Sequence, residues 1–437
     1  MLPQWEKIAP PRDARYAEEL DVQEPRFHPG LHRTAWLVAI FTFPLIFVGG
    51  LVTTKGVGMS VPDWPNSYGY NMWFFPPSQW IGGIFWEHLH RLKGTLVGFA
   101  AIVLVMQAWG PARHPFVRKL LAGIAGAMLG LALMMSVSLF TLSGTPARIM
   151  EHTISIFASM GLIAGAAWIS PVREERRWVR WLSVWLLIAV IVQGTLGGLR
   201  VSEVSLTLAI IHGVFAQAFF GLCIVMIVVT SRWWLRNSTV HLPHGRALKT
   251  MLLVSVIALF VQLIVGAIMR HHQAGLAIPD LPLHYGRLLP PTTATELAEV
   301  NAYRSRPDVF LPIVSLEQIW LHFAHRVGAV IVSVLLIVSA ILAFRCDRRA
   351  GLGMLTIGML VLLVVQFTLG LLTVYYRKPA DIASSHVAVG ALLLVVTIAL
   401  LTRVARVHRS PRSAGAVHAG DPLDAARGAG VKWEPAR

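Results

Sequence analysis

The sequence predicts an all-α polytopic membrane protein of about ten transmembrane helices, built as two repeat-related four-helix bundles plus an inserted helical hairpin. Three observations lead to this fold: apolar runs recur along the chain, basic residues concentrate in alternate loops, and the two halves resemble each other. Of the 437 residues, 55% are hydrophobic and only 14% are charged. This composition, with runs long enough to cross a bilayer, is typical of multi-pass membrane proteins.

Ten apolar segments are long enough to span a membrane. We place them at about 35–54, 82–108, 120–140, 152–170, 181–198, 204–230, 248–269, 316–344, 353–375 and 383–402. A polar tail (1–34) precedes them, and we expect the basic tail (403–437) to be disordered. A long outer loop (270–315) separates the seventh and eighth segments. We expect no cleavable signal peptide, because the first apolar segment is a full span.

The distribution of Lys and Arg sets the orientation. The loops at 110–119, 171–180, 231–249 and 345–349 each carry three or four basic residues, whereas the short loops on the opposite side carry one or two. The positive-inside rule then puts both termini in the cytoplasm, in a membrane of the bacterial inner (cytoplasmic) type. It also accounts for most of the net charge of +16, so we expect lipid and not nucleic acid as the surrounding partner.

An internal repeat divides the chain. Val48-Gly49, Gly58, Pro62-Asp63, Pro65 and Tyr68-Gly69 recur at a constant offset of 217 as Val265-Gly266, Gly275, Pro279-Asp280, Pro282 and Tyr285-Gly286. Each half is therefore expected to form one bundle, at 35–230 and 248–402. The first half is longer by about one helical hairpin, which we place at about 112–172.

Four histidines lie at one depth of the predicted bundles. His90 and His212 belong to the first half, and His325 and His386 to the second. Ionisable residues inside a membrane usually serve function, and two imidazoles from facing helices can bind a haem iron. We expect Gly94, Gly98, Gly194, Gly197, Gly198 and Gly221 to leave room for a flat macrocycle, and His271, His272 and His284 to be solvated in the long outer loop. Neither His152 nor His322 receives a ligand role.

Two other metal sites were weighed. A di-iron carboxylate centre needs a Glu-x-x-His motif on two helices; Glu87 and His90 form one, but His322 stands where the second Glu would be. A zinc site from His88, His90 and His152 lacks diagnostic spacing.

Charged residues adjoin the expected ligands. Arg91 and Arg326 directly follow His90 and His325, and they are candidates for pairing with haem propionates or for interfacial positions. Glu87 lies one helical turn before His90 and has no acidic counterpart in the second half. This asymmetry indicates chemistry in the first bundle, unless Glu87 is hydrogen-bonded to the outer loop as a structural residue.

At these residues the sequence resembles the heme A synthase family. The shared motifs are Gly49-Gly50-Leu51, Trp86-Glu87-x-x-His90-Arg91, Gln193-Gly194-x-Leu196-Gly197, His212, His325-Arg326, Gln366-x-x-Leu369-Gly370 and His386. The chain departs from the family in its extra predicted hairpin and in the lack of cysteines in the outer loops.

The resemblance implies oxidation of the C8 methyl group of haem O to the formyl group of haem A. It implies that His90 and His212 bind the substrate iron, that His325 and His386 bind a haem b iron, and that Glu87 is catalytic. Implied partners are haem O and its synthase, an electron donor, a terminal oxidase as recipient and a second copy of the chain. The alternative is a non-enzymatic di-haem b-type electron carrier, and a third class is a haem exporter or chaperone.

Overall fold

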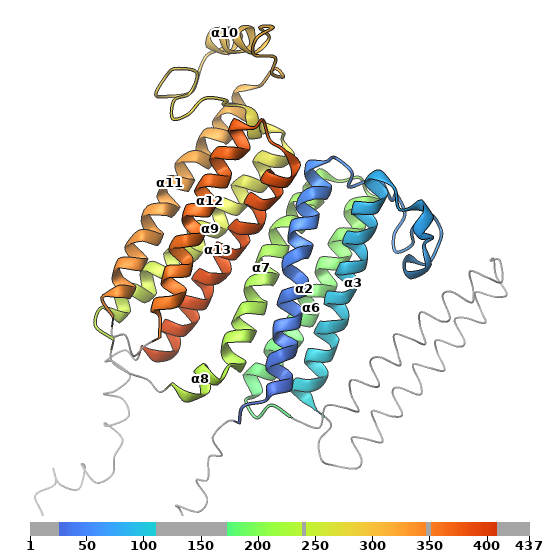
Figure 1. Ribbon diagram of the computed structural model, residues 1–437, viewed down its shortest axis with the longest axis vertical. Helices are drawn as coiled ribbons and strands as arrows, with labels where there is room; N and C mark the ends of the chain where they lie inside the picture. The colour runs from blue at the N-terminus through green and yellow to red at the C-terminus, as the bar shows by residue number, and fades with distance from the viewer. Residues whose placement is uncertain (1–25, 111–172, 238–241, 347–350, 409–437) are drawn as a thin grey trace, which may run out of the picture.

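The computed structural model describes residues 26–110, 173–237, 242–346 and 351–408 (Figure 1). Within these ranges helices are the regular secondary structure, and isolated β-bridges pair Ser67 with Tyr70 and His284 with Arg287. Eight described helices are long and apolar enough to cross a membrane: α2 (Pro29–Thr54), α3 (Gly82–Trp109), α6 (Arg177–Ser202), α7 (Leu206–Thr230), α9 (Gly245–His271), α11 (Leu316–Phe344), α12 (Gly353–Tyr375) and α13 (Ala380–Val407). The chain is an integral membrane protein.

Eight of the ten expected spans coincide with these helices to within a few residues. The expected spans at 120–140 and 152–170, and with them the hairpin at 112–172, lie outside the described residues. Two shorter helices, α8 (Arg232–Arg236) and α10 (Ala294–Arg304), lie between spans. Single turns of 3₁₀ helix occur at Met72–Phe74, Pro77–Gln79 and Ala274–Leu276.

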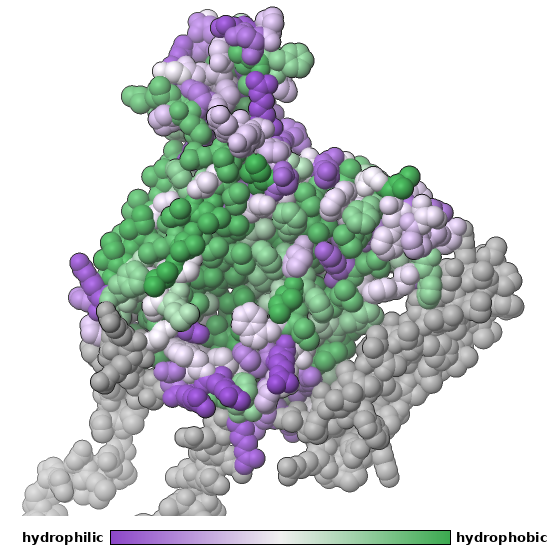
Figure 2. Space-filling view, in the orientation of Figure 1, coloured by the Kyte–Doolittle hydropathy of each residue, from purple (hydrophilic) through white to green (hydrophobic). Residues whose placement is uncertain are grey.

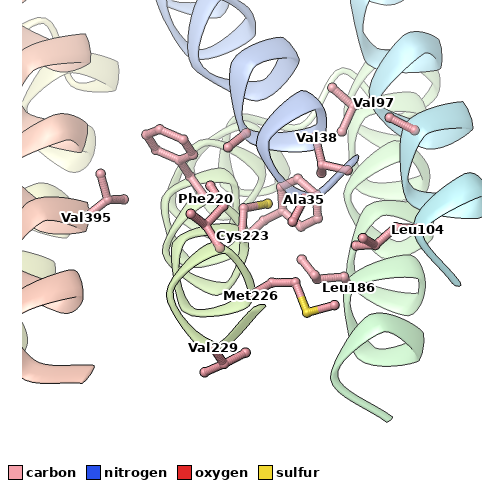
Figure 3. Packing of buried hydrophobic residues seen from close by; sticks show 14 of the residues in the cluster. Ala35, Val38, Val97, Leu104, Leu186, Phe220, Cys223, Met226, Val229 and Val395 are labelled. Atoms are coloured by element: carbon pink, nitrogen blue, oxygen red, sulfur yellow. The ribbon is translucent and has the colours of Figure 1, made fainter. Parts of the chain in front are cut away.

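The eight helices form two groups. Helices α2, α3, α6 and α7 make the first bundle, and α9, α11, α12 and α13 make the second, each around its own apolar core (Figure 1). Figure 3 shows the first core, where Val38 and Leu104 from α2 and α3 meet Leu186 from α6 and Met226 from α7. Burial of this apolar surface against neighbouring helices, more than helix propensity, selects the arrangement.

The bundles pack against each other through their inner helices. Helices α2 and α7 contact α13, and α7 also contacts α9. Val395 of α13 belongs to the core of the first bundle, as Figure 3 shows. Arg270, at the end of α9, donates hydrogen bonds to the Gly50 carbonyl and the Thr54 hydroxyl of α2. The apolar flanks of the bundles form a wide belt, whereas hydrophilic residues gather at the lower end and around α10 (Figure 2).

Two loops cover the same end of the molecule, which we call the outer end. The first outer loop is residues 55–81 and the second is residues 272–315, which contains α10 (Figure 1). In each loop one Asp carboxylate accepts hydrogen bonds from two successive backbone N–H groups: Asp63 from Tyr68 and Gly69, and Asp280 from Tyr285 and Gly286. The two tyrosines share a left-handed backbone, with φ of 52° and 57°. The repeat in the sequence is therefore a repeat of loop structure.

Candidate functional site

Each bundle brings together one pair of histidines. His90 of α3 faces His212 of α7 with ring centroids 6.4 Å apart, and His325 of α11 faces His386 of α13 at the same 6.4 Å. A metal–imidazole bond is about 2 Å long and a ring nitrogen lies about 1 Å from the ring centre, so imidazoles on opposite sides of one ion have centroids about 6 Å apart. Both pairs fit axial ligation of a single metal ion.

Backbone carbonyls orient one histidine of each pair. The Nδ1 atom of His212 lies 3.2 Å from the Gln193 carbonyl oxygen, and Nδ1 of His386 lies 3.2 Å from the carbonyl of Gln366. Because a carbonyl only accepts, Nδ1 carries the proton and the lone pair of Nε2 is available to a metal. The side chains of the same glutamines contact these rings. Nε2 of Gln193 lies 3.4 Å from Nε2 of His212, and Nε2 of Gln366 lies 3.4 Å from Nε2 of His386.

Both glutamines also carry a buried amide oxygen without a hydrogen-bond partner. Oε1 of Gln193 and Oε1 of Gln366 are enclosed next to the histidine pairs. Buried polar atoms in proteins are almost always hydrogen-bonded, so each of these oxygens could accept a hydrogen bond from a further group; Gln107 and Gln217 carry the same kind of orphan elsewhere.

A glycine packs against each of the four histidines. A Cβ atom at these glycines would lie 2.9 to 3.1 Å from the ring Cε1 atom: Gly49 against His90, Gly197 against His212, Gly266 against His325, and Gly370 against His386. Any larger residue would displace the ring. The Gln-x-x-x-Gly motif thus supplies the oxygen that orients the histidine and the space that the ring occupies.

The other expected glycines divide into two kinds. At Gly94, Gly98 and Gly194 an added Cβ would meet nothing within 4 Å, which agrees with open space beside the first pair. At Gly198 and Gly221 the Cβ would collide with Trp64 and Ile398. These two glycines permit close packing and leave no room, so the expectation was wrong for them.

Glu87 is 2% exposed, and both of its carboxylate oxygens are engaged. Oε2 accepts a hydrogen bond from the Val61 backbone N–H at 2.9 Å, and Oε1 forms an ion pair with Arg91 at 3.0 Å. The carboxylate therefore ties the first outer loop to α3, one turn before His90.

His322 makes the same two contacts in the second bundle. Its Nδ1 lies 3.2 Å from the Ile278 backbone N, and its Nε2 lies 3.3 Å from Nε of Arg326. Ile278 is the repeat equivalent of Val61. A neutral imidazole accepts only one hydrogen bond, so the two sites share the same neighbours at this position but differ in charge and in the number of hydrogen bonds accepted.

The arginines beside the ligands hold the outer loops. Arg91 donates to the carbonyls of Val61, Asp63 and Asn66 at 2.5 to 3.0 Å, in addition to Glu87. Arg326 donates likewise to the carbonyls of Ile278, Asp280 and Leu283. Because a guanidinium has five N–H groups, each arginine retains a single donor for another partner.

One amide distinguishes the second site from the first. Gln262 of α9 donates from Nε2 to the His325 carbonyl at 2.7 Å and lies 3.1 Å from its ring Nδ1. The equivalent position in α2 is Leu45, whose side chain has no polar group. His325 therefore has a side-chain neighbour of a kind that His90 lacks.

The remaining histidines fall outside the two pairs. His88 is fully buried between Phe75 and Trp80, with ring centroids 5.0 and 4.7 Å away. His284 is buried against Phe323, so the expectation that it is solvated was wrong. His272 is exposed and His271 is half-buried, whereas His152 lies outside the described residues.

Among the described residues, no group of three or more His, Cys, Asp or Glu side chains is arranged to hold a metal ion. A zinc or di-iron centre made of protein ligands alone needs more side chains than a pair. The paired imidazoles are instead suited to a metal whose other ligands come from a bound macrocycle.

Sequence reasoning passed over Arg200, which the fold brings to the first histidine pair. Arg200 lies in the last turn of α6 and interacts electrostatically with both His90 and His212. From the sequence, Arg200 was interpreted only as the single basic residue of a short loop on the outer side.

Residues 150–398, more than half of the chain, match the model of a family described as cytochrome oxidase assembly protein (COX15-CtaA). The chain belongs to this family. Its matched region contains three of the four paired histidines; His90 precedes it.

Curated relatives of this cytochrome oxidase assembly family member are named Heme A synthase. The protein from Shewanella oneidensis is 25% identical over 50% of this chain and 65% of its own length. The Rickettsia prowazekii protein is 23% identical over 36% of this chain and 43% of its own length, and the Rhizorhabdus wittichii protein is 25% identical over 83% and 90%. The chain thus spans less than two thirds of the first two relatives and nine-tenths of the third.

Proposed function

We propose that this family member is a heme A synthase that oxidises the C8 methyl group of haem O to a formyl group. The observation that carries the proposal is the pair of matched imidazoles in each bundle, with centroids 6.4 Å apart. Membership of a cytochrome oxidase assembly family and relatives named Heme A synthase support it.

The two bundles take different roles in this proposal. His90 and His212, in the half at 35–230, bind the iron of the substrate haem O. His325 and His386, in the half at 248–402, bind a resident haem b. The asymmetry supports this division, since the acidic Glu87 and the open glycines Gly94 and Gly98 belong to the first bundle.

Bound haem iron supplies the redox chemistry, because no side chain oxidises a methyl group by itself. The residues of the chain fix geometry and charge. Gln193 orients His212 through its carbonyl, and Gly197 sets the position of the ring. Arg91 holds Glu87 in place, and its carboxylate provides a fixed negative charge one turn from His90 that stabilises positive charge developing on the substrate carbon. Arg91 and Arg326 each retain one donor for a propionate.

The setting follows from topology. We propose a cytoplasmic membrane of the bacterial type with both termini in the cytoplasm, so that both histidine pairs lie toward the outer face. Haem O would come from its synthase, haem A would pass to a terminal oxidase, and an electron donor and a second copy of the chain are the further partners.

The test is haem extraction and mass analysis from membranes of a host that supplies haem O, with and without this chain. We expect haem A, or its hydroxylated precursor, only when the chain is present. Haem B alone, with haem O unchanged and reductant supplied, would overturn the synthase proposal in favour of a di-haem electron carrier.

A further inference from the structure

We propose that Arg200 is the residue that binds a carboxylate of the tetrapyrrole in the first bundle. The inference rests on the proposed function in that the ligand is a haem, and it adds a specific contact that distinguishes the substrate site from the second site.

Arg200 lies at the outer end of the first histidine pair. It follows Gly197 by three residues in α6, so the guanidinium lies about one helical turn outward of the glycine that packs on His212. Its electrostatic interactions with His90 and His212 put the positive charge at the outer end of this pair. Carboxylates of a macrocycle held by these histidines would lie within the reach of a long side chain at one edge of the ring.

The hydrogen bonding of Arg200 is largely unused. In the described part of the chain, it donates one hydrogen bond, from Nη2 to the Gly58 carbonyl at 2.8 Å, and forms no ion pair. Glu87 interacts with it electrostatically, but both oxygens of that carboxylate bind other groups. A half-buried guanidinium without an anion is costly at the edge of a membrane, and a ligand carboxylate would remove that cost through bidentate hydrogen bonds.

Three other enclosed arginines of the described residues have several partners each. Arg176 forms an ion pair with Glu174 at 2.6 Å, and Arg91 forms one with Glu87. The buried Arg304 donates to three carbonyls and the Tyr285 hydroxyl. At the first histidine pair, Arg200 has four unused N–H donors, whereas Arg91 retains one.

The second bundle has no equivalent charge. The residue in the place of Arg200 is Thr373, whose hydroxyl donates to the Leu369 carbonyl of its own helix at 2.7 Å. Together with Glu87, Arg200 is one of the charged residues that the first site has and the second site lacks at the equivalent position. A site that binds and releases a ligand needs recognition of that ligand, for which a charged anchor is well suited.

The test compares two probes on the haem-depleted full-length chain in nanodiscs. Iron protoporphyrin IX carries free propionates, and its dimethyl ester carries none. Binding to the first site is followed as the absorbance change that is absent from His90→Ala. We expect the wild-type chain to bind the free acid about tenfold more tightly than the ester, as loss of one charged hydrogen-bonding pair implies.

Three variants make the comparison specific. Arg200→Gln should lose the preference for the acid while its affinity for the ester is unchanged, and Arg200→Lys should keep the preference. Thr373→Ala, the matched change in the second bundle, should behave as the wild type. An unchanged second-site spectrum reports that each variant is folded.

Two results of this comparison would overturn the inference. One is an acid-to-ester ratio in Arg200→Gln equal to that of the wild type, including the case in which neither shows a preference. The other is an equal loss of both probes, which would mean that Arg200 only supports Gly58. Formyl product from haem O is measured separately on the wild type, so failure of the synthase proposal and failure of the carboxylate contact are distinct outcomes. Adding vesicles rich in phosphatidylglycerol tests whether an anionic lipid binds Arg200 instead. If these vesicles displace the free-acid porphyrin, the inference is also overturned.

Discussion

Glu87 and His322 occupy the same place in the two bundles and hold the same two groups, a backbone N–H of the outer loop and the arginine one turn further along the helix. The carboxylate accepts a hydrogen bond from each group, whereas a neutral imidazole accepts from only one of them and still occupies the same place between loop and helix. What differs is the negative charge, which is present in the first site alone.

Glu87→His transfers the residue of the second bundle into the first. We expect the variant to keep its first outer loop and its haem content while formyl product falls about a hundredfold, because the stabilising charge is gone. Product is measured by mass analysis of extracted haem. Wild-type levels of haem A from this variant would reduce Glu87 to a loop-holding residue.

Glu87→Ala removes the loop attachment as well as the charge. It leaves Arg91 and the Val61 N–H without their partner, so we expect a loss of stability of about 3 kcal/mol that Glu87→His does not show. Thermal unfolding in detergent measures the difference. Equal stability of the two variants would contradict the shared role of Glu87 and His322.

Substitutions in the two histidine pairs should affect the two haem sites independently. His325→Ala or His386→Ala should remove the haem b spectrum, because a single imidazole no longer closes the axial pair. His90→Ala or His212→Ala should leave that spectrum and prevent haem O binding. Haem stoichiometry and low-temperature electron paramagnetic resonance measure the occupancy of the haem b site and of the haem O site. The variants of each pair serve as the control for the other pair. An unchanged haem b spectrum in either second-bundle variant would refute the assignment.

Gly197→Ala should displace the His212 ring, since the new Cβ would lie 2.9 Å from Cε1. We expect first-site haem affinity to fall about tenfold, within the usual range for disturbed ligand support. Gly213→Ala, in α7 with nothing within 4 Å, is the control and should bind normally. A titration monitored by absorbance compares them, and similar affinities would rule out close packing as the determinant of ring position.

The helix α10 should weaken in acid. Backbone N–H groups of Thr292 and Thr293, together with Arg287, lower the pKa of Glu296 below its ordinary 4.5. A lowered pKa in the folded state adds stability that is complete above pH 4.5 and is lost as the pH falls through the folded value.

Amide hydrogen exchange, expressed as protection factors, measures this effect in the first turn of α10. Protection should fall below pH 4.5 in the wild type, and at neutral pH already in Glu296→Gln. Glu299→Gln, which loses only one exposed ion pair with Arg287, should retain it. Protection of the wild type that is constant down to pH 3 would contradict the capping role.

Much of this architecture was predictable because the repeat is carried by residues with strict conformational demands. The spacing of Asp63, Tyr68 and Gly69 recurs in Asp280, Tyr285 and Gly286. The same hydrogen bonds from backbone N–H groups to the Asp carboxylate form in both loops. The distribution of basic residues between loops and the lengths of the apolar segments predicted that the four histidines lie at the same depth in the membrane. Both are local properties that can be read from a single sequence.

The partners of charged groups were harder to predict. Arg91 was a candidate for propionate pairing or for an interfacial position, but the sequence did not predict that most of its acceptors are loop carbonyls, because backbone atoms carry no residue-specific signal. Arg200 meets the first histidine pair through the packing of α6 on α3 and α7, a relation between segments distant in sequence. His284 is buried because the second outer loop folds onto Phe323, which composition does not reveal.

The contact of α7 with α13 has a consequence for the distance between the sites. Each of these inner helices carries one histidine of a pair, His212 or His386, and the two helices pack directly against each other. Membranes of different thickness change the tilt of a helical protein more readily than its internal packing. The length of any electron path from one site to the other is thus fixed by the protein and is the same in every bilayer.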